Sequence, residues 1–200
     1  MTLPVIPLPT PLSQLAHTLA LLLTLALLPG SASAQEATRT TRESSIVAFN
    51  GTYRLVSGQG GIRRAVDAVC GRLDFVTRAI ARPILEDRNR AYRQVQLDVD
   101  QQTVRFTMGP WGPVRTRFGA TATVPNERDE TTQVRQMRVG HRLVQTFSTE
   151  QGTRRNVLTL SDDGRRLVID TLITSPRLPI PLRYRLTYER DARTAQHAST

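Results

Sequence analysis

The chain has 200 residues but only one cysteine, three histidines and no lysine. A single cysteine, Cys70, excludes an intramolecular disulfide, so the fold depends on its core alone. His141 and His197 are the histidines that follow the apolar N-terminal segment, and two are too few for a histidine-rich metal centre. The Gly-x-Ser-x-Gly, His-Glu-x-x-His and Cys-x-x-Cys motifs are also missing. We therefore expect no catalytic residues, no metal site and no cofactor.

Long apolar runs are lacking except at one place, Leu19 to Leu28. This run is shorter than the roughly 20 residues that a membrane-spanning helix needs. The sequence Ala32-Ser33-Ala34 follows it, as is typical of a signal-peptidase site. Because no Arg or Lys precedes the run, an uncleaved anchor is the alternative. We expect residues 1–34 to be a signal peptide that is cleaved after Ala34, which makes the protein periplasmic or secreted.

The charge of the chain comes from one kind of basic residue. All 27 basic residues are Arg, against 17 acidic residues, and the formal net charge is +10. Such a balance attracts anionic partners. Because the Arg residues are scattered from Arg39 to Arg193 and export is expected, we predict no nucleic-acid partner. An anionic membrane surface is the alternative partner, and the sequence indicates no oligomeric state.

The rest of the chain contains one strong helical pattern. Apolar residues recur at helical spacing while Arg residues lie off this stripe, which predicts a helix over 62–82. Pro83 then ends or bends the helix. Residues 35–45 are polar and predict a flexible lead before the first strand. The apolar stripe consists of Ile62, Val66, Val69, Leu73, Val76 and Ile80.

After Tyr92 the sequence consists of short β-rich segments between turn signals. Connections this short join antiparallel neighbours, and a meander leaves two open edges unless it closes on itself. The predicted fold is mainly β, an antiparallel up-and-down β-barrel of about eight to ten strands over 46–190, with the helical insert after the first strand and a loose tail over 191–200. The expected strands are 46–57, 95–99, 103–108, 114–124, 131–139, 141–149, 153–161, 165–175 and 182–190.

The first strand carries a resemblance to a known superfamily. Residues 49–57 contain Gly51 followed two residues later by Tyr53. This is similar to the Gly-x-Trp signature in the opening strand of the calycin superfamily, the lipocalins and fatty-acid-binding proteins. A helical segment directly after strand one, followed by an unbroken meander, resembles the fatty-acid-binding branch. The resemblance covers about residues 49–190 and implies a barrel that holds a small hydrophobic molecule.

One feature of that branch is not reproduced. Fatty-acid-binding proteins hold the carboxylate with Arg-x-Tyr in the final strand, whereas Tyr188 is preceded at this spacing by Leu186, and Tyr184 by Leu182. The resemblance therefore does not imply a fatty-acid anion as the ligand. The chain also resembles exported bacterial proteins, a resemblance that implies no function.

The strands place apolar residues at alternating positions, so these residues share one face. A barrel of this size is either filled by side chains or holds one small ligand. Gln145 and Asn156 fall on the apolar positions of their strands, and an inward polar group needs a partner, which can be a ligand, water or another side chain. We therefore predict an exported, non-enzymatic protein that binds a small hydrophobic or amphipathic molecule inside the barrel. The predicted lining residues are Phe106, Met108, Leu143, Gln145, Phe147, Asn156, Leu158, Leu160, Tyr184 and Tyr188.

Two features are predicted to lie at an end of the barrel. Trp111 stands between two Gly-Pro pairs and either plugs one end, guards a pocket or touches a membrane. The helix is predicted to act as a lid through Ile62, Val66 and Leu73. A basic amphipathic helix also favours anionic lipid. The alternative function is therefore an envelope module that docks on anionic lipid or a partner protein through its Arg-rich surface.

Overall fold

The computed structural model describes residues 46–109, 111–125 and 131–191. The predicted signal peptide over 1–34, the lead over 35–45 and all but the first residue of the predicted tail lie outside this part of the chain. The described elements are β1 Gly51–Ser57, α2 Gln59–Cys70, α3 Phe75–Arg88, β2 Gln94–Val99, β3 Thr103–Met108, β4 Trp111–Arg117, β5 Thr121–Pro125, β6 Thr131–Val139, β7 Arg142–Thr149, β8 Gly152–Leu160, β9 Arg166–Thr174 and β10 Leu182–Arg190.

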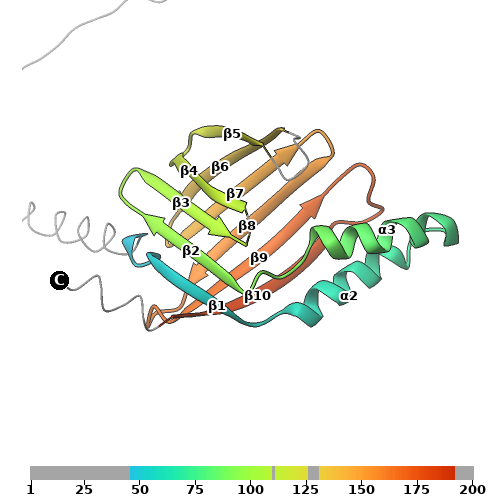
Figure 1. Cartoon of the computed structure of the whole chain (residues 1–200), viewed down its shortest axis with the longest axis horizontal. Helices are drawn as coiled ribbons and strands as arrows, with labels where there is room; N and C mark the ends of the chain where they lie inside the picture. The colour runs from blue at the N-terminus through green and yellow to red at the C-terminus, as the bar shows by residue number, and fades with distance from the viewer. Residues whose placement is uncertain (1–45, 110, 126–130, 192–200) are drawn as a thin grey trace, which may run out of the picture.

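The strands of the described residues form one antiparallel ten-stranded sheet in the order β4-β3-β2-β1-β10-β9-β8-β7-β6-β5. Consecutive strands pair with each other, except for β4 and β5, which form the two edges, and β1 also pairs with β10. The sheet curves until its two edges approach (Figure 1). This is the nearly closed antiparallel barrel, with helices after the first strand, that the sequence predicted.

Hydrogen bonds join β4 and the turn after it to β6, the strand next to the opposite edge of the sheet. In the turn after β4, the Gly119 N–H donates to the Gln136 carbonyl of β6 at 2.8 Å. The Arg135 Nε of β6 donates back to the Gly119 carbonyl at 3.0 Å. Inside the barrel, the Gln136 Nε2 donates to the Thr116 Oγ1 of β4 at 3.1 Å. Backbone groups that an open edge would leave to solvent are therefore partly satisfied across the seam.

Two predicted strands differ from the structure. The strand predicted over 114–124 is the end of β4 and all of β5, because Gly119 adopts a φ of 78° that turns the chain back on itself. The strand predicted over 46–57 begins at Gly51. Residues 46–50 instead form a helical turn in which the Asn50 N–H donates to the Val47 carbonyl at 2.9 Å.

The helix predicted over 62–82 is two helices. Gly71 follows the last residue of α2, and Asp74 begins α3 by accepting a hydrogen bond from the Thr77 N–H at 3.0 Å. Pro83 lies inside α3 and does not end it. The break divides the apolar stripe: its α2 members are buried, whereas Val76 and Ile80 on α3 are exposed.

The helical hairpin leaves the barrel beside β10. Gly58, at φ 117°, begins α2 so close to β10 that a Cβ there would collide with the Arg185 carbonyl. α2 packs along β10 and buries Ile62 and Val66. The far end of the hairpin projects away from the barrel (Figure 1). Neither α2 nor α3, the helices of the described residues, combines the length and apolarity of a membrane span.

Candidate ligand-binding site

Five polar residues form a continuous row inside the barrel. Each lies directly opposite the next in the strand register, from β6 through β7, β8 and β9 to β10. All five are buried, and the exposed fraction rises along the row from 0% at Gln136 to 9% at Tyr184. We call this set the polar row: Gln136, Gln145, Asn156, Thr171 and Tyr184.

Hydrogen bonds join two neighbouring pairs within the polar row. The Gln136 Nε2 donates to the Val104 carbonyl at 3.3 Å as well as to Thr116, and its Oε1 accepts from the Gln145 Nε2 at 2.7 Å. Because a carbonyl oxygen only accepts, this contact orients both amide groups. On the next strand pair, the Thr171 Oγ1 donates to the Asn156 Oδ1 at 3.0 Å.

One atom of the polar row has no partner. The Oε1 of Gln145 is buried and accepts no hydrogen bond from the described residues. Its amide nitrogen faces Gln136, so the oxygen is turned away from that neighbour. Buried polar atoms in folded proteins are nearly always paired with protein or water, and a lone acceptor inside a barrel requires an explanation.

Apolar residues border the polar row on both sides. Towards the helices, Phe147, Ile173 and Leu182 lie on neighbouring register positions with Arg154 among them. Away from the helices, Leu143 faces Leu158. The lining is therefore apolar with one polar stripe, as is common in binding sites for small molecules.

We call the end of the barrel near the helices the mouth. Here Arg154 of β8 donates through Nη2 to the Arg88 carbonyl at 2.9 Å and to the Asn89 Oδ1 at 2.8 Å, both at the end of α3. The Tyr184 hydroxyl donates to the same Asn89 oxygen at 3.4 Å. Arg88 also donates to the Gln151 side chain at 3.2 Å. The last turn of α3 is therefore tied across the mouth to β8, β10 and the β7–β8 turn.

At the opposite end, which we call the closed end, two tyrosines and a phenylalanine fill the interior. Tyr53 and Tyr188 are 0% exposed, and Phe49 packs beside them in the core. Arg190 donates to the carbonyls of Ala48 and Asn50, to the Gly164 carbonyl at 2.9 Å and to the Tyr53 hydroxyl at 2.7 Å. The guanidinium also lies 5.0 Å from the centre of the Tyr53 ring.

Burial at the closed end changes the acidity of its tyrosines. It raises the pKa of Tyr53 to about 12, because the phenolate would lose its hydration, and the Arg190 charge offsets part of this. Burial also raises the pKa of Tyr188, with a further contribution from the nearby Tyr184. Both phenols are therefore neutral at physiological pH. Arg190 acts here as a structural clamp, since its donors are directed to backbone carbonyls and a phenol.

The structure places the ten predicted lining residues on the inner face of the barrel. Seven of them are buried, and Met108, Phe147 and Leu160 are partly buried. They do not form one site, because Tyr188 and Leu160 belong to the closed end while Phe147 and Tyr184 lie at the mouth.

The predicted rim residues have different positions. Ile62 and Val66 are buried where α2 packs against β10, and they share one core cluster with the inward-facing barrel residues. Leu73 is partly buried where the chain passes between the two helices. Trp111 begins β4, and its side chain lies outside what the structure describes. The last turn of α3, which follows the predicted helix, covers the mouth.

Sequence reasoning missed Gln136 and Thr171, the partners of Gln145 and Asn156. Thr171 carries a detectable signal, since it occupies the alternate position between Ile169 and Ile173, whereas Gln136 lies between Val134 and Arg138 at this spacing. It also missed Asn89 and Arg154, for which one strand or helix alone gives no signal. Their pairing joins residues 65 positions apart in the chain.

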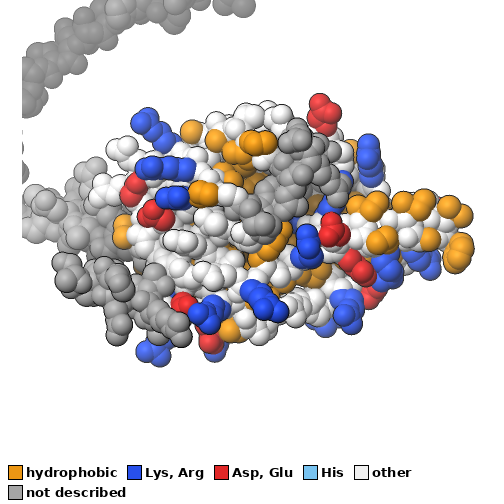
Figure 2. Space-filling view, viewed as in Figure 1, with side chains coloured by type: hydrophobic (Ala, Val, Ile, Leu, Met, Phe, Trp, Pro, Cys, Tyr) orange, Lys and Arg blue, Asp and Glu red, His pale blue; other side chains and the backbone are white. Residues whose placement is uncertain are grey.

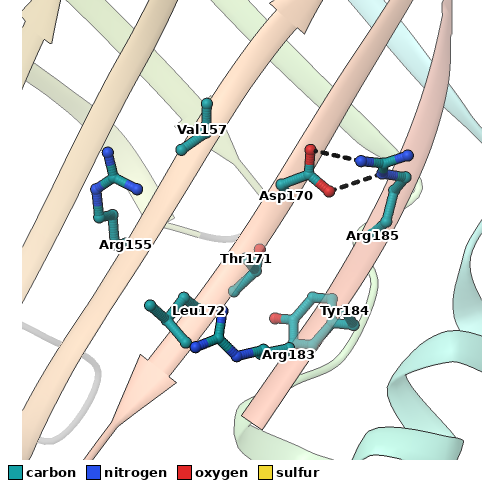
Figure 3. A pocket seen from close by; sticks show the side chains of 8 residues that line it. All are labelled: Arg155, Val157, Asp170, Thr171, Leu172, Arg183, Tyr184 and Arg185. Carbon is teal, nitrogen blue, oxygen red and sulfur yellow. Dashed lines mark hydrogen bonds and ion pairs between the residues drawn. The ribbon is translucent and has the colours of Figure 1, made fainter. Parts of the chain in front are cut away.

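Two hollows lie on the outer surface of the barrel. The larger, of about 450 Å³, lies over β8, β9 and β10 (Figure 3). The Arg185 side chain there donates to Asp170 at 2.7 and 3.0 Å, which fills part of it. The smaller, of about 110 Å³, lies over β2 and β3.

Among residues 46–191, apart from the undescribed gaps, no three His, Cys, Asp or Glu side chains are grouped to hold a metal ion.

No protein-family model matches the chain, and no curated protein sequence matches it. Solved structures are similar at low identity. A zebrafish ileal bile-acid-binding protein complexed with cholic acid has 14% identity and a TM-score of 0.48, over 72% of this chain and 99% of that one. A Schistosoma mansoni fatty-acid-binding protein in complex with arachidonic acid has 16% identity and a TM-score of 0.46, over 74% and 99%. Fatty-acid-binding protein 1 of Echinococcus granulosus has 11% identity and a TM-score of 0.45, over 72% of this chain and 98% of that one. What the chain binds is therefore argued from its own residues.

Proposed function

We propose that this protein is a non-enzymatic binding protein that holds a small hydrophobic or amphipathic molecule in the mouth half of its barrel. The observation that carries the proposal is the contrast within one inner face. Phe147 and Ile173 at the mouth are only partly buried although they face inward, whereas Leu143 and Leu158 are 0% exposed. Partly solvated apolar side chains beside a polar row are what a ligand with an apolar body would cover.

A co-purified ligand provides the first test. The protein is purified from its own host under native conditions and weighed by native mass spectrometry, then weighed again after denaturation. We expect an additional mass in the native state that is lost on denaturation. A native mass that equals the polypeptide mass, together with no saturable binding of apolar probes, would contradict the proposal.

A pair of bulky substitutions on β9 locates the site. Ile173 faces inward at the mouth, whereas its neighbour Leu172 faces outward. Ile173→Trp fills the mouth and should weaken binding of the neutral apolar probe N-phenyl-1-naphthylamine at least about tenfold, through loss of space and contact. Leu172→Trp is the matched control and should leave the affinity unchanged. Equal effects of the two variants would place the probe elsewhere.

Export forms part of the same proposal. The apolar run at Leu19 to Leu28 and the Ala32-Ser33-Ala34 sequence support removal of residues 1–34. Intact-mass measurement and N-terminal sequencing of the protein from the periplasmic and extracellular fractions should find a chain that begins at Gln35. A full-length chain retained in the membrane fraction would indicate the uncleaved anchor instead.

One observation favours a second function, docking on an anionic membrane surface. The face of α3 formed by Val76, Ile80 and Ile84, together with Phe75 at its start, is exposed, and the exposed fraction of Phe75 is 82%. Figure 2 shows these hydrophobic side chains along the projecting hairpin, with Arg side chains beside them. An apolar helix face flanked by Arg is suited to the interface of an anionic bilayer.

Vesicle sedimentation tests this second function. The full protein should pellet with phosphatidylglycerol vesicles at low salt and less at high salt, because salt screens the Arg contribution. Replacing Val76 and Ile80 together by Ser should reduce pelleting several-fold. Val139→Ser is the matched control, since Val139 is also exposed but lies on β6. Binding that is insensitive to Val76 and Ile80 would contradict docking through α3.

A further inference from the structure

The polar row contains only amide and hydroxyl groups, and this composition restricts the kind of ligand it recognises. Amides and hydroxyls hydrogen-bond neutral groups well, but they do not balance a buried charge. The cation nearest the row in the strand register is Arg154, two residues before Asn156. Its guanidinium already donates to Asn89 and to the Arg88 carbonyl.

The direction of donation along the row defines what is missing. Val104 and Thr116 take the amide hydrogens of Gln136, so Gln136 presents its oxygen to the amide nitrogen of Gln145. The remaining Gln145 Oε1 is an acceptor, and it is left without a donor in a side chain that is 0% exposed. A group that satisfies it must bring a hydrogen, and a carboxylate brings none.

The row also gives a route from outside. Burial decreases steadily from Gln145 through Asn156 and Thr171 to Tyr184, which lies at the mouth beside Asn89. The inner end of the row is closed, because Gln136 and Gln145 have no exposed surface. A donor therefore reaches the Gln145 Oε1 only when side chains nearer the mouth shift.

We propose that the barrel selects an amphipathic ligand whose polar end is a neutral hydrogen-bond donor, a hydroxyl or N–H group, which donates to the Gln145 Oε1. The inference rests on the proposed function and names its ligand class. Alcohols, including sterol-like alcohols, and primary amides belong to this class. Ethers, hydrocarbons and carboxylate anions do not.

A chain-matched set of ligands tests the inference. Dodecan-1-ol has a donor and an acceptor, 1-methoxydodecane has only an acceptor, and dodecanoate is an anion. Their affinities are measured by displacement of N-phenyl-1-naphthylamine from the full mature protein. We expect dodecan-1-ol to bind about tenfold more tightly than the ether, since a buried acceptor gains its missing hydrogen bond. Dodecanoate should bind more weakly than the alcohol.

Gln145→Met keeps the shape of the side chain and removes the acceptor. It should reduce the alcohol-to-ether ratio to about one, whereas Thr146→Met, on the outward-facing position next to it in the same strand, should leave that ratio unchanged. If Gln145→Met does not fold, the ratio in the unsubstituted protein still decides the question. Equal affinities for alcohol and ether, or tightest binding of dodecanoate, would overturn the inference while leaving the proposed function intact. Failure of all three molecules to bind would overturn the proposed function itself.

Discussion

The two ends of the barrel are built from the same strands but differ in how their side chains are packed. At the closed end, Arg190 links the helical turn of residues 46–50 to Gly164 in the turn between β8 and β9. Tyr53 and Tyr188 fill the interior there. At the mouth, the end of α3 is held by the hydrogen bonds of Arg154 to Asn89 and to the Arg88 carbonyl. From this comparison we expect the mouth to open more readily than the closed end.

The largest difference between the two ends is expected for alanine substitutions of two inward-facing residues on β7, Leu143 and Phe147. Leu143→Ala leaves a cavity in the closed interior and should lower the free energy of unfolding by about 3 kcal/mol. Phe147→Ala at the mouth removes more atoms but should cost less than half as much, because the site is already partly exposed. Urea denaturation of both variants measures the difference. Equal losses would show that the mouth is packed as tightly as the closed end.

Alkaline pH should act on the closed end through Tyr53. Its folded pKa of about 12 lies above the unfolded value of 10.0, so the folded state keeps a proton that the unfolded state releases. Stability from this group is complete below about pH 10 and is lost as the pH rises through 12, by about 3 kcal/mol in total. Tyr53→Phe should be less stable at neutral pH, because it loses the hydroxyl contacts, but should show a shallower alkaline decline. Urea unfolding across this range measures both, and parallel declines would contradict the assignment.

The role of Arg190 as a clamp can be separated from its charge. Arg190→Met removes its hydrogen bonds to the residue 46–50 turn and to Gly164, and should cost about 2 kcal/mol. Arg183→Met on the outer face of the same strand is exposed and should change stability by less than about 0.5 kcal/mol. Both variants lose one positive charge. Similar effects in urea denaturation would mean that net charge, and not the clamp, explains the loss.

The smallest stability effect should come from the mouth. Asn89→Ala removes the acceptor shared by Arg154 and Tyr184 and should lower stability by about 1 kcal/mol. Amide hydrogen exchange in α3 should nevertheless accelerate much more than exchange in β9, because only the end of α3 is released. Uniform acceleration over both elements would show that the α3 end and the barrel open as one unit.

The sequence predicted the barrel best where strand and turn signals agree. β6 and β10 begin and end where alternation and flanking turn residues placed them. The prediction over 114–124 was wrong because Gly119 is the only turn signal within a Thr-rich stretch. The helix over 62–82 was drawn too long because apolar spacing continues across the break at Gly71, although Asp74 is a good N-cap.

The candidate site was partly predictable for a related reason. Alternation within a strand places Gln145 and Asn156 inside the barrel, and the structure has them there. Gln136 and Thr171 continue the polar row because of the register between neighbouring strands. Hydrogen bonding and barrel closure determine this register. The contact of Asn89 with Arg154 depends on how the α3 end packs on the mouth, and no local pattern encodes it.

The central claim is that the mouth of the barrel binds a ligand and the closed end does not. Methyl NMR of the mature protein during titration with dodecan-1-ol tests this claim most directly. Saturable shifts are expected for the methyl groups of Ile173 and Leu182, with little change at Ile46 and Leu167 in the closed end. Shifts of the same size at both ends, or shifts restricted to Val76 and Ile80 on the outer face of α3, would contradict an interior site at the mouth.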